Sequence, residues 1–208
     1  MRDFLSGIHY NSWILPALLI IPLVGAILLW IQRAASGVDE ADVKVEPARQ
    51  IALWTLIIEF IVSCGLWWSF VPGIAGWQAG VDYAWIPAWG VRFSIGIDGI
   101  SLMLVLLTTL TMPLAVLGGW TAIKTKVHAY LALLLVLTSG MLGVFLARDL
   151  FLFYVMWEVM LIPMYFIIGI WGGQRRIYAS LKFFIYTMLG SLLMLVAIIY
   201  LGIHNRDL

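Results

Sequence analysis

Three ionisable side chains lie inside long apolar stretches of this 208-residue chain and are its strongest candidates for chemistry. They are Glu158 in 151-FLFYVMWEVMLIPMYFIIGIWGG-173, Lys182, and Glu59 in 51-IALWTLIIEFIVSCGLWWSF-70. A charge near the centre of a membrane helix costs at least ~2.5–3.5 kcal/mol on insertion scales, so such residues are functional candidates by default. That argument depends on whether these stretches cross a membrane.

The composition is that of a membrane protein. The chain is 63% hydrophobic and only 11% charged, whereas soluble domains are about 45–50% apolar and about 25% charged. Its net charge of +1 gives no reason to expect a nucleic-acid partner. The single cysteine, Cys64, excludes a disulfide framework, and the three histidines are too far apart for metal-ligand spacing.

Six stretches are long and apolar enough to cross the ~30 Å hydrocarbon core, which takes roughly 20 residues of helix. Helix is the expected state, because a lone strand cannot satisfy its backbone in lipid. The first stretch is not a cleavable signal peptide, because Asp3 closely follows Arg2 and the apolar run is long enough to span. The predicted fold is therefore all-α, with spans at about 13–31, 51–71, 100–120, 129–147, 150–171 and 178–202.

The loops predict two further features. Within 72–99, the alternating segment 91-VRFSIGI-97 predicts a short strand or hairpin at the membrane surface, between the second and third helices. Six spans place the loops 32–50, 121–128 and 172–177 on one side, with more Lys and Arg than the other. That side is therefore predicted to be cytoplasmic, and both chain ends periplasmic. The basic residues of the predicted cytoplasmic side are Arg33, Lys44, Arg49, Lys124, Lys126, Arg175 and Arg176, and those of the other side are Arg2, Arg92, Arg148 and Arg206.

Glu158 is the leading candidate. It follows Asp149 by nine residues, which places it ~13 Å inside the membrane, too deep for its side chain to reach the surface. Its helical neighbours Tyr154, Val155, Leu161 and Ile162 offer no countercharge. Its partner must come from another helix, or the group is protonated. Pro163 predicts a kink and a freed carbonyl nearby. The alternative is a neutral Glu that hydrogen-bonds between helices.

Lys182 and Glu59 are more ambiguous. Lys182 lies seven residues past Arg175, ~10 Å from the surface, so it could extend its amine outward. Its depth is expected to differ from that of Glu158 by only ~7 Å, which would let the two groups relay a proton. Glu59 has hydroxyls at Thr55 and Ser63 on its own face, which favours a hydrogen-bonded structural Glu and leaves a functional role as the alternative.

Other polar and small residues have structural explanations. Asp98, in 96-GIDGIS-101, is expected to cap the following helix. Paired glycines are expected to let helices pack closely, at Gly140 with Gly143 and at Gly169 with Gly172. The sequence holds no Ser/His/Asp set, phosphate-binding loop or metal cluster, so it predicts no cofactor or metal on this chain.

Two long segments resemble the antiporter-like membrane subunits of bacterial respiratory complex I, the NADH–quinone oxidoreductase. They are Leu150–Gly173 followed by 175-RRIYASLKFFIYTMLGSLLMLVAIIYL-201, and the upstream 93-FSIGIDGISLMLVLLTTLTMPLAVL-117. The resemblance covers nearly the whole chain from about Ile14. It implies a proton-translocating subunit of the bacterial cell membrane, with Glu158 as an essential group of a buried charge relay and Lys182 as a further charged member.

The resemblance also implies a larger assembly. NADH oxidation and quinone reduction belong to other subunits of the complex, which hold NAD, FMN, iron–sulfur clusters and quinone. Members of the family have about fourteen helices, so this chain is expected to be an N-terminal part. Residues 1–128 would form three helices with surface loops, and 129–208 the first three helices of the proton-translocating repeat. The Glu partner, a lysine of the seventh helix, would then be missing, which leaves Lys182 as the candidate countercharge.

Two alternatives remain open on the sequence. One is a cation/proton antiporter or membrane-bound hydrogenase subunit, which shares the fold and the buried Glu. The other is a structural membrane subunit that packs against partners and carries no ions. The WGG–RR–YAS–KFF–YT run favours the complex I subunit over the antiporter.

Overall fold

The computed structural model describes residues 5, 7, 9–36, 45–74 and 76–204. The six predicted spans are confirmed as helices that are long and apolar enough to cross a membrane. The first, second and sixth helices begin two to six residues before the predicted runs, whereas the limits of the other three lie within two residues of them. The helices are α2 (Tyr10–Ser36), α3 (Val45–Ser69), α4 (Gly99–Gly118), α5 (Val127–Leu146), α6 (Leu150–Trp171) and α7 (Arg176–His204).

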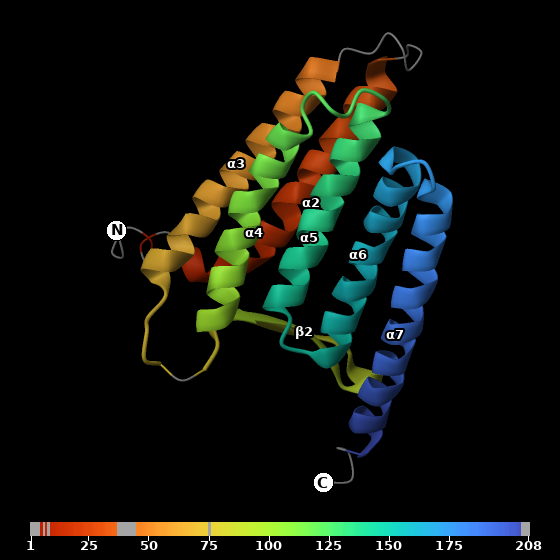
Figure 1. The fold of residues 1–208 in the computed structure, drawn as a ribbon. Helices are drawn as coiled ribbons and strands as arrows, with labels where there is room; N and C mark the ends of the chain where they lie inside the picture. The colour runs from red at the N-terminus through yellow and green to blue at the C-terminus, as the bar shows by residue number, and fades with distance from the viewer. Residues whose placement is uncertain (1–4, 6, 8, 37–44, 75, 205–208) are drawn as a thin grey trace.

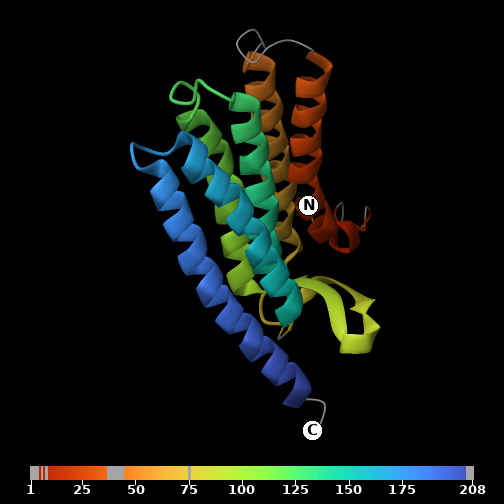
Figure 2. The same cartoon turned by 90° about the vertical axis from the view of Figure 1, so that its right-hand side faces the viewer.

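The helices stand side by side, with α2 to α5 forming a bundle and α6 and α7 added along one flank (Figure 1). The rotated view shows α7 as the outermost helix, extending past the other helices at its C-terminal end (Figure 2). Burial follows this arrangement. Of the 18 most apolar consecutive residues of each helix, 56% are buried in α5 and 6% are buried in α7. The flank formed by α6 and α7 is therefore the more open part of the protein.

Two clusters of buried apolar side chains hold the bundle together. One includes Leu15, Leu66 and Leu146, with Ile95 of the loop between α3 and α4. The other includes Leu29, Leu56 and Leu135 from α2, α3 and α5. Because lipid tails are as apolar as leucine, such helices are held by close packing and by hydrogen bonds between them.

The predicted strand at 91–97 is present as β2 (Val91–Ile97). It pairs antiparallel with β1 (Gln78–Ile86), and a single 3-10 turn, Pro87–Trp89, joins the strands. Gly90 closes that turn at φ 73°, a left-handed conformation that suits glycine. The hairpin lies at the end of the bundle opposite the α2–α3 and α4–α5 connections (Figure 1). Its position at a membrane surface stays a prediction.

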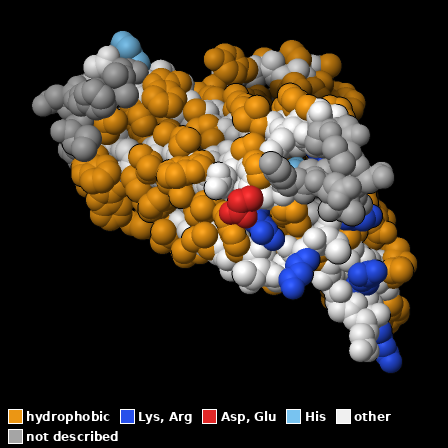
Figure 3. All heavy atoms as spheres, turned by 90° about the horizontal axis from the view of Figure 1, so that it is seen from above, with side chains coloured by type: hydrophobic (Ala, Val, Ile, Leu, Met, Phe, Trp, Pro, Cys, Tyr) orange, Lys and Arg blue, Asp and Glu red, His pale blue; other side chains and the backbone are white. Residues whose placement is uncertain are grey.

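The end of α2, the start of α3, the α4–α5 connection and the α6–α7 connection all lie at one end of the helices (Figure 1). A view onto that end shows more Lys and Arg side chains than Asp and Glu side chains (Figure 3). The separation into a basic end and a hairpin end thus agrees with the sequence. Which end faces the cytoplasm stays a prediction.

Candidate functional site

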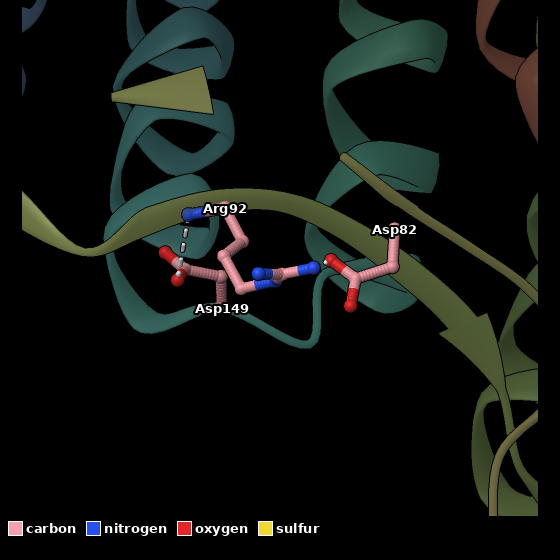
Figure 4. A network of polar contacts seen from close by, with 3 residues as sticks. All are labelled: Asp82, Arg92 and Asp149. Atoms are coloured by element: carbon pink, nitrogen blue, oxygen red, sulfur yellow. Dashed lines mark hydrogen bonds and ion pairs between the residues drawn. The ribbon is translucent and has the colours of Figure 1, made fainter. Parts of the chain in front are cut away.

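The hairpin fixes the start of α6, the helix that carries Glu158. The Arg92 side chain donates to Asp82 at 2.8 Å, and the Arg92 backbone N–H donates to the Asp149 carboxylate at 3.3 Å (Figure 4). Asp149 in turn caps α6, accepting from the N–H groups of Phe151 at 2.9 Å and Leu152 at 3.0 Å. The Arg92 guanidinium also lowers the pKa of the Asp82 carboxyl. This charged network therefore sets where α6 begins.

A second contact ties the hairpin to the turn between α5 and α6. The Arg148 N–H donates to the Ser94 carbonyl at 2.9 Å, and Ile95 pairs with Ala147 in an isolated bridge. The Arg148 guanidinium lies 5.5 Å from the centre of the Trp77 ring. The α5–α6 turn is thus held from the outside by the hairpin.

Close packing of α5 against α6 sets the depth and rotation of Glu158. A Cβ atom on Gly140 would lie 2.7 Å from Met160 Cγ, and one on Gly143 would lie 2.6 Å from Met156 Sδ. Neither position has room for a side chain, so the predicted role of this glycine pair in helix packing is confirmed. Because these two residues are glycines, α6 can pack closely on α5, with Met160 against Gly140 and Met156 against Gly143.

Glu158 is half-buried, and its Oε1 atom is buried with no hydrogen-bond partner among the described residues. The Tyr154 hydroxyl, one turn earlier on the same helix, interacts electrostatically with the Glu158 carboxyl. The Ser191 hydroxyl of α7 donates to the Met188 carbonyl at 3.0 Å. The carboxyl therefore lies beside the Tyr154 hydroxyl on the flank where α6 meets α7. No countercharge accompanies it within the part of the chain that is described.

The structure does not pair Lys182 with Glu158. Lys182 is exposed on α7, and its amine lies 5.9 Å from the centre of the Tyr178 ring. The described residues form two ion pairs, Arg49 with Glu46 and Arg92 with Asp82, and neither involves Lys182. The expectation that Lys182 supplies the countercharge within this chain is therefore wrong for this arrangement.

The reason is the packing register of α6 against α7. Tyr165 packs on Phe184 with ring centres 5.5 Å apart, and Gly169 faces Ser180. These contacts place Lys182 level with about residue 167 of α6. Glu158 lies nine residues from that level, which corresponds to ~13 Å along the helix. Lys182 and Glu158 therefore differ in depth by more than the expected ~7 Å, because α6 and α7 are offset along their axes.

Glu59 differs from its sequence interpretation. It is fully buried, and both carboxyl oxygens lack a hydrogen-bond partner among the described residues. The Thr55 hydroxyl donates instead to the Ile51 carbonyl at 2.7 Å. The Ser63 hydroxyl bonds the Phe60 carbonyl and the Thr109 hydroxyl, each at 2.8 Å. The predicted sharing of hydrogen bonds on one helix face is therefore wrong.

Two features near the site were missed by sequence reasoning. Ser191 was not singled out, although a small polar residue in an apolar helix is a weak signal for a contact between helices. The second is the buried stripe of α3, which repeats every three or four residues and carries Glu59 into the bundle. Its members are Ala48, Ala52, Leu56, Glu59, Ser63 and Leu66.

Pro163 lies inside α6, which continues as one helix from Leu150 to Trp171. The predicted kink stays a prediction. In the described part of the chain, no three His, Cys, Asp or Glu side chains are grouped in a way that could hold a metal ion. The candidate site therefore consists of carboxyls, hydroxyls and one exposed amine.

Comparison with known proteins places these residues in a family. Residues 147–205, which include both Glu158 and Lys182, match the family described as "NADH:quinone oxidoreductase/Mrp antiporter, TM". Subunit M of the NADH-quinone oxidoreductase of Rhodobacter capsulatus is 46% identical over 179 residues. That match covers 86% of this chain and 34% of the relative. The chain thus spans about a third of the length of that curated relative.

Solved structures show the same architecture. A chain of respiratory complex I from Thermus thermophilus aligns with a TM-score of 0.70 at 27% identity, covering 88% of this chain and 34% of that one. A chain of an archaeal membrane-bound sulfane sulfur reductase aligns with a TM-score of 0.68 at 25% identity, covering 88% and 27%. The helical fold described above is therefore similar to part of a larger antiporter-like subunit.

Proposed function

We propose that this chain, which belongs to the antiporter-like family that includes NADH-quinone oxidoreductase subunit M, forms part of a proton path through a membrane. The observation that carries the proposal is the place of Glu158. Its carboxyl lies deep in α6 with one buried, unpartnered oxygen, inside the segment that matches the family. A buried carboxyl without an ion pair among the described residues supports a role in a proton path more than one in a fixed ion pair.

In this proposal Glu158 is the proton carrier. Its neutral form suits the apolar site, and its ionised form needs a positive group to approach from outside the described chain. The Tyr154 hydroxyl can donate to the carboxylate or accept from the acid. Lys182 lies on the exposed face of α7, where its charge changes the proton affinity of nearby groups without direct contact.

The proposed setting is a multi-subunit respiratory complex of a bacterial cell membrane. NADH oxidation and quinone reduction would take place in other subunits, with NAD, FMN, iron–sulfur clusters and quinone bound there. This chain would contribute as a subunit of the translocase, packed against other membrane subunits and lipid. The Lys and Arg distribution favours a periplasmic N-terminus.

A second function is exchange of a cation for a proton. The matched family is described by both NADH:quinone oxidoreductase and Mrp antiporter, and a chain of a sulfane sulfur reductase complex shares the fold. The two functions differ in what drives proton movement. Proton transport that follows NADH oxidation favours the first, and transport that follows an imposed Na⁺ or K⁺ gradient favours the second.

The test is Glu158→Gln in the full-length subunit within its complex, measured in inverted membrane vesicles. We expect the complex to assemble and NADH-driven proton uptake to fall at least tenfold, because glutamine cannot release a proton. Glu46→Gln is the matched control, since Glu46 is an exposed acidic residue in the first turn of α3. Proton uptake in Glu158→Gln equal to that of the control would overturn the assignment.

A further inference from the structure

A cavity of about 200 Å³ opens at the basic end of the bundle, remote from Glu158. It lies between the end of α2, the start of α3 and the start of α5, and three exposed or partly exposed cations line it: Arg33, Lys124 and Lys126. Pockets for drug-sized ligands measure about 300–1,000 Å³. This cavity therefore suits a compact group, such as the head of a lipid, rather than a whole cofactor.

The cavity has two features that select an anion. Lys126 begins α5 without a side-chain cap, so the first N–H groups of this 20-residue helix are left for another acceptor. The positive end of the helix dipole points the same way. His128, which lines the cavity, is 7% exposed, and its Nε2 atom is buried without a hydrogen-bond partner among the described residues.

The loop that brings the lysines to the cavity is held in place. Arg49 of α3 donates to the Ile123 carbonyl at 3.0 Å, and its guanidinium lies 5.6 Å from the centre of the Trp120 ring. Within residues 9–36, 45–74 and 76–204, no carboxylate forms an ion pair with Lys124 or Lys126. The two amines are thus positioned by the fold but not neutralised by its described part.

The cavity carries a residue that is typical of the membrane–water interface. Trp30, on its rim, is 73% exposed near the end of α2, and tryptophan side chains gather at the membrane–water interface. The remaining lining is mainly apolar, including Val45, Val127 and Ala132. Basic pockets between membrane helices characteristically bind anionic headgroups. An acyl chain would continue along the exposed apolar side of α2.

We propose that this cavity, between α2, α3 and the uncapped start of α5, binds the phosphate of an anionic phospholipid. The phosphate lies on the α5 N–H groups and on Lys124 and Lys126, and the buried His128 nitrogen bonds it from inside. The bound lipid joins the α2–α3 pair to α5 at this end of the bundle. The site is independent of the proton path at Glu158.

The experiment measures lipid retention by native mass spectrometry on the full complex in detergent. Titration with phosphatidylglycerol is expected to load one tightly held lipid, and phosphatidylcholine is not. Lys126→Gln should weaken that binding about fivefold, since one cation near a headgroup contributes roughly that factor. Arg175→Gln is the matched control, because it removes an equally exposed charge at the same end but outside the cavity.

Two further arms make the result decisive. Ala132→Leu keeps every charge but narrows the cavity, so it should also reduce retention of phosphatidylglycerol. Inorganic phosphate at millimolar concentration should not displace the lipid, because it lacks the acyl chains. Equal losses in Lys126→Gln and Arg175→Gln, or no loss in Ala132→Leu, would show diffuse surface attraction and overturn the site. Displacement by phosphate would show a free-anion site and overturn the lipid assignment.

Discussion

Two buried carboxyls at nearly the same depth have opposite surroundings. Gly25 of α2 faces both Thr55 and Leu135, which places Glu59 level with about residue 139 of α5. The contact of Gly140 with Met160 places Glu158 level with about residue 142. The two carboxyls thus differ in depth by about three residues, or ~5 Å. One lies inside the α2–α5 bundle and the other on the α6–α7 flank.

On the proposed function, the difference between them separates a proton carrier from an enclosed carboxyl. Glu59 is fully enclosed, and the nearby hydroxyls of Thr55 and Ser63 are engaged elsewhere. Glu158 is half-buried beside the hydroxyl of Tyr154, on a flank open to further helices. Burial alone therefore does not mark the relay. A buried carboxyl also needs polar neighbours and a face that a partner can approach.

The packing of α6 on α5 is the part of this comparison most sensitive to mutation. Gly143→Leu would place a side chain where Met156 already lies. We expect a loss of about 3 kcal/mol, at the upper end for overpacking, with failure of α6 to dock and loss of coupled proton uptake. Subunit content of purified membranes is the measurement. Gly190→Leu, at an open position of α7, is the control. Normal assembly of Gly143→Leu would contradict the close packing.

The enclosed carboxyl should be replaceable. Glu59→Leu removes a buried polar group that has no described partner, so we expect the folded state to gain about 1–3 kcal/mol. The measurement is a higher temperature of thermal unfolding of the complex. Glu59→Gln retains a buried polar group and should bring no gain. Proton uptake should stay within twofold in both variants. Loss of uptake in both would instead give Glu59 a place in the relay, the alternative left open by the sequence.

Lys182 should have a smaller effect than Glu158. The amine is exposed and ~13 Å from the level of Glu158, so its charge acts at a distance and is screened. We expect Lys182→Ala to reduce NADH-driven proton uptake no more than about threefold, measured in the same vesicles as Glu158→Gln. Lys182→Arg, which keeps the charge, should restore it. A loss as complete as that in Glu158→Gln would mean that a further helix brings Lys182 into the path.

Much of the fold follows from the sequence because the bilayer fixes the length of each span. The alternation in 91–97 predicted β2, and the spacing of Gly140 and Gly143 predicted a close helix contact. These signals are local, so they survive without knowledge of the partner helix. The Asp98 cap is local too: its carboxylate accepts from the N–H groups of Ile100 and Ser101, at 3.1 and 2.7 Å.

The contacts that the sequence mispredicted depend on how helices face one another. Thr55 bonds a carbonyl of its own helix rather than Glu59, as threonine hydroxyls in helices often do. The Ser63 hydroxyl forms a hydrogen bond with the Thr109 hydroxyl of α4, and the spacing of residues within α3 does not predict this contact. The offset of Lys182 from Glu158 arises from aromatic and glycine contacts between α6 and α7. Register between helices is a property of packing, and a single sequence does not record it.

The smallest predicted effect concerns Asp98, which caps the start of α4 in the enclosed bundle. It separates the contribution of the carboxylate charge to stability from that of the capping hydrogen bonds. Hydrogen bonds from the Ser101 N–H lower the pKa of the Asp98 carboxyl. A lowered pKa in the folded state means that the cap stabilises α4 above the ordinary carboxyl pKa, about 3.9, and loses this contribution as the pH falls further. Asp98→Asn keeps the capping geometry without a titrating group.

We therefore expect Asp98→Asn to change stability at pH 7 by only a few tenths of a kcal/mol, because asparagine and aspartate cap helices about equally well. The protection of amides in the first turn of α4, relative to their intrinsic exchange rates, should then be independent of pH between about 5 and 3, whereas in the unmodified chain this protection should fall on acidification. Asp98→Ala, which removes the cap, should exchange faster at every pH, with a loss of about 1 kcal/mol. Equal pH dependence in Asp98→Asn and the unmodified chain would place the titrating group elsewhere, at the hairpin carboxylates that hold α6.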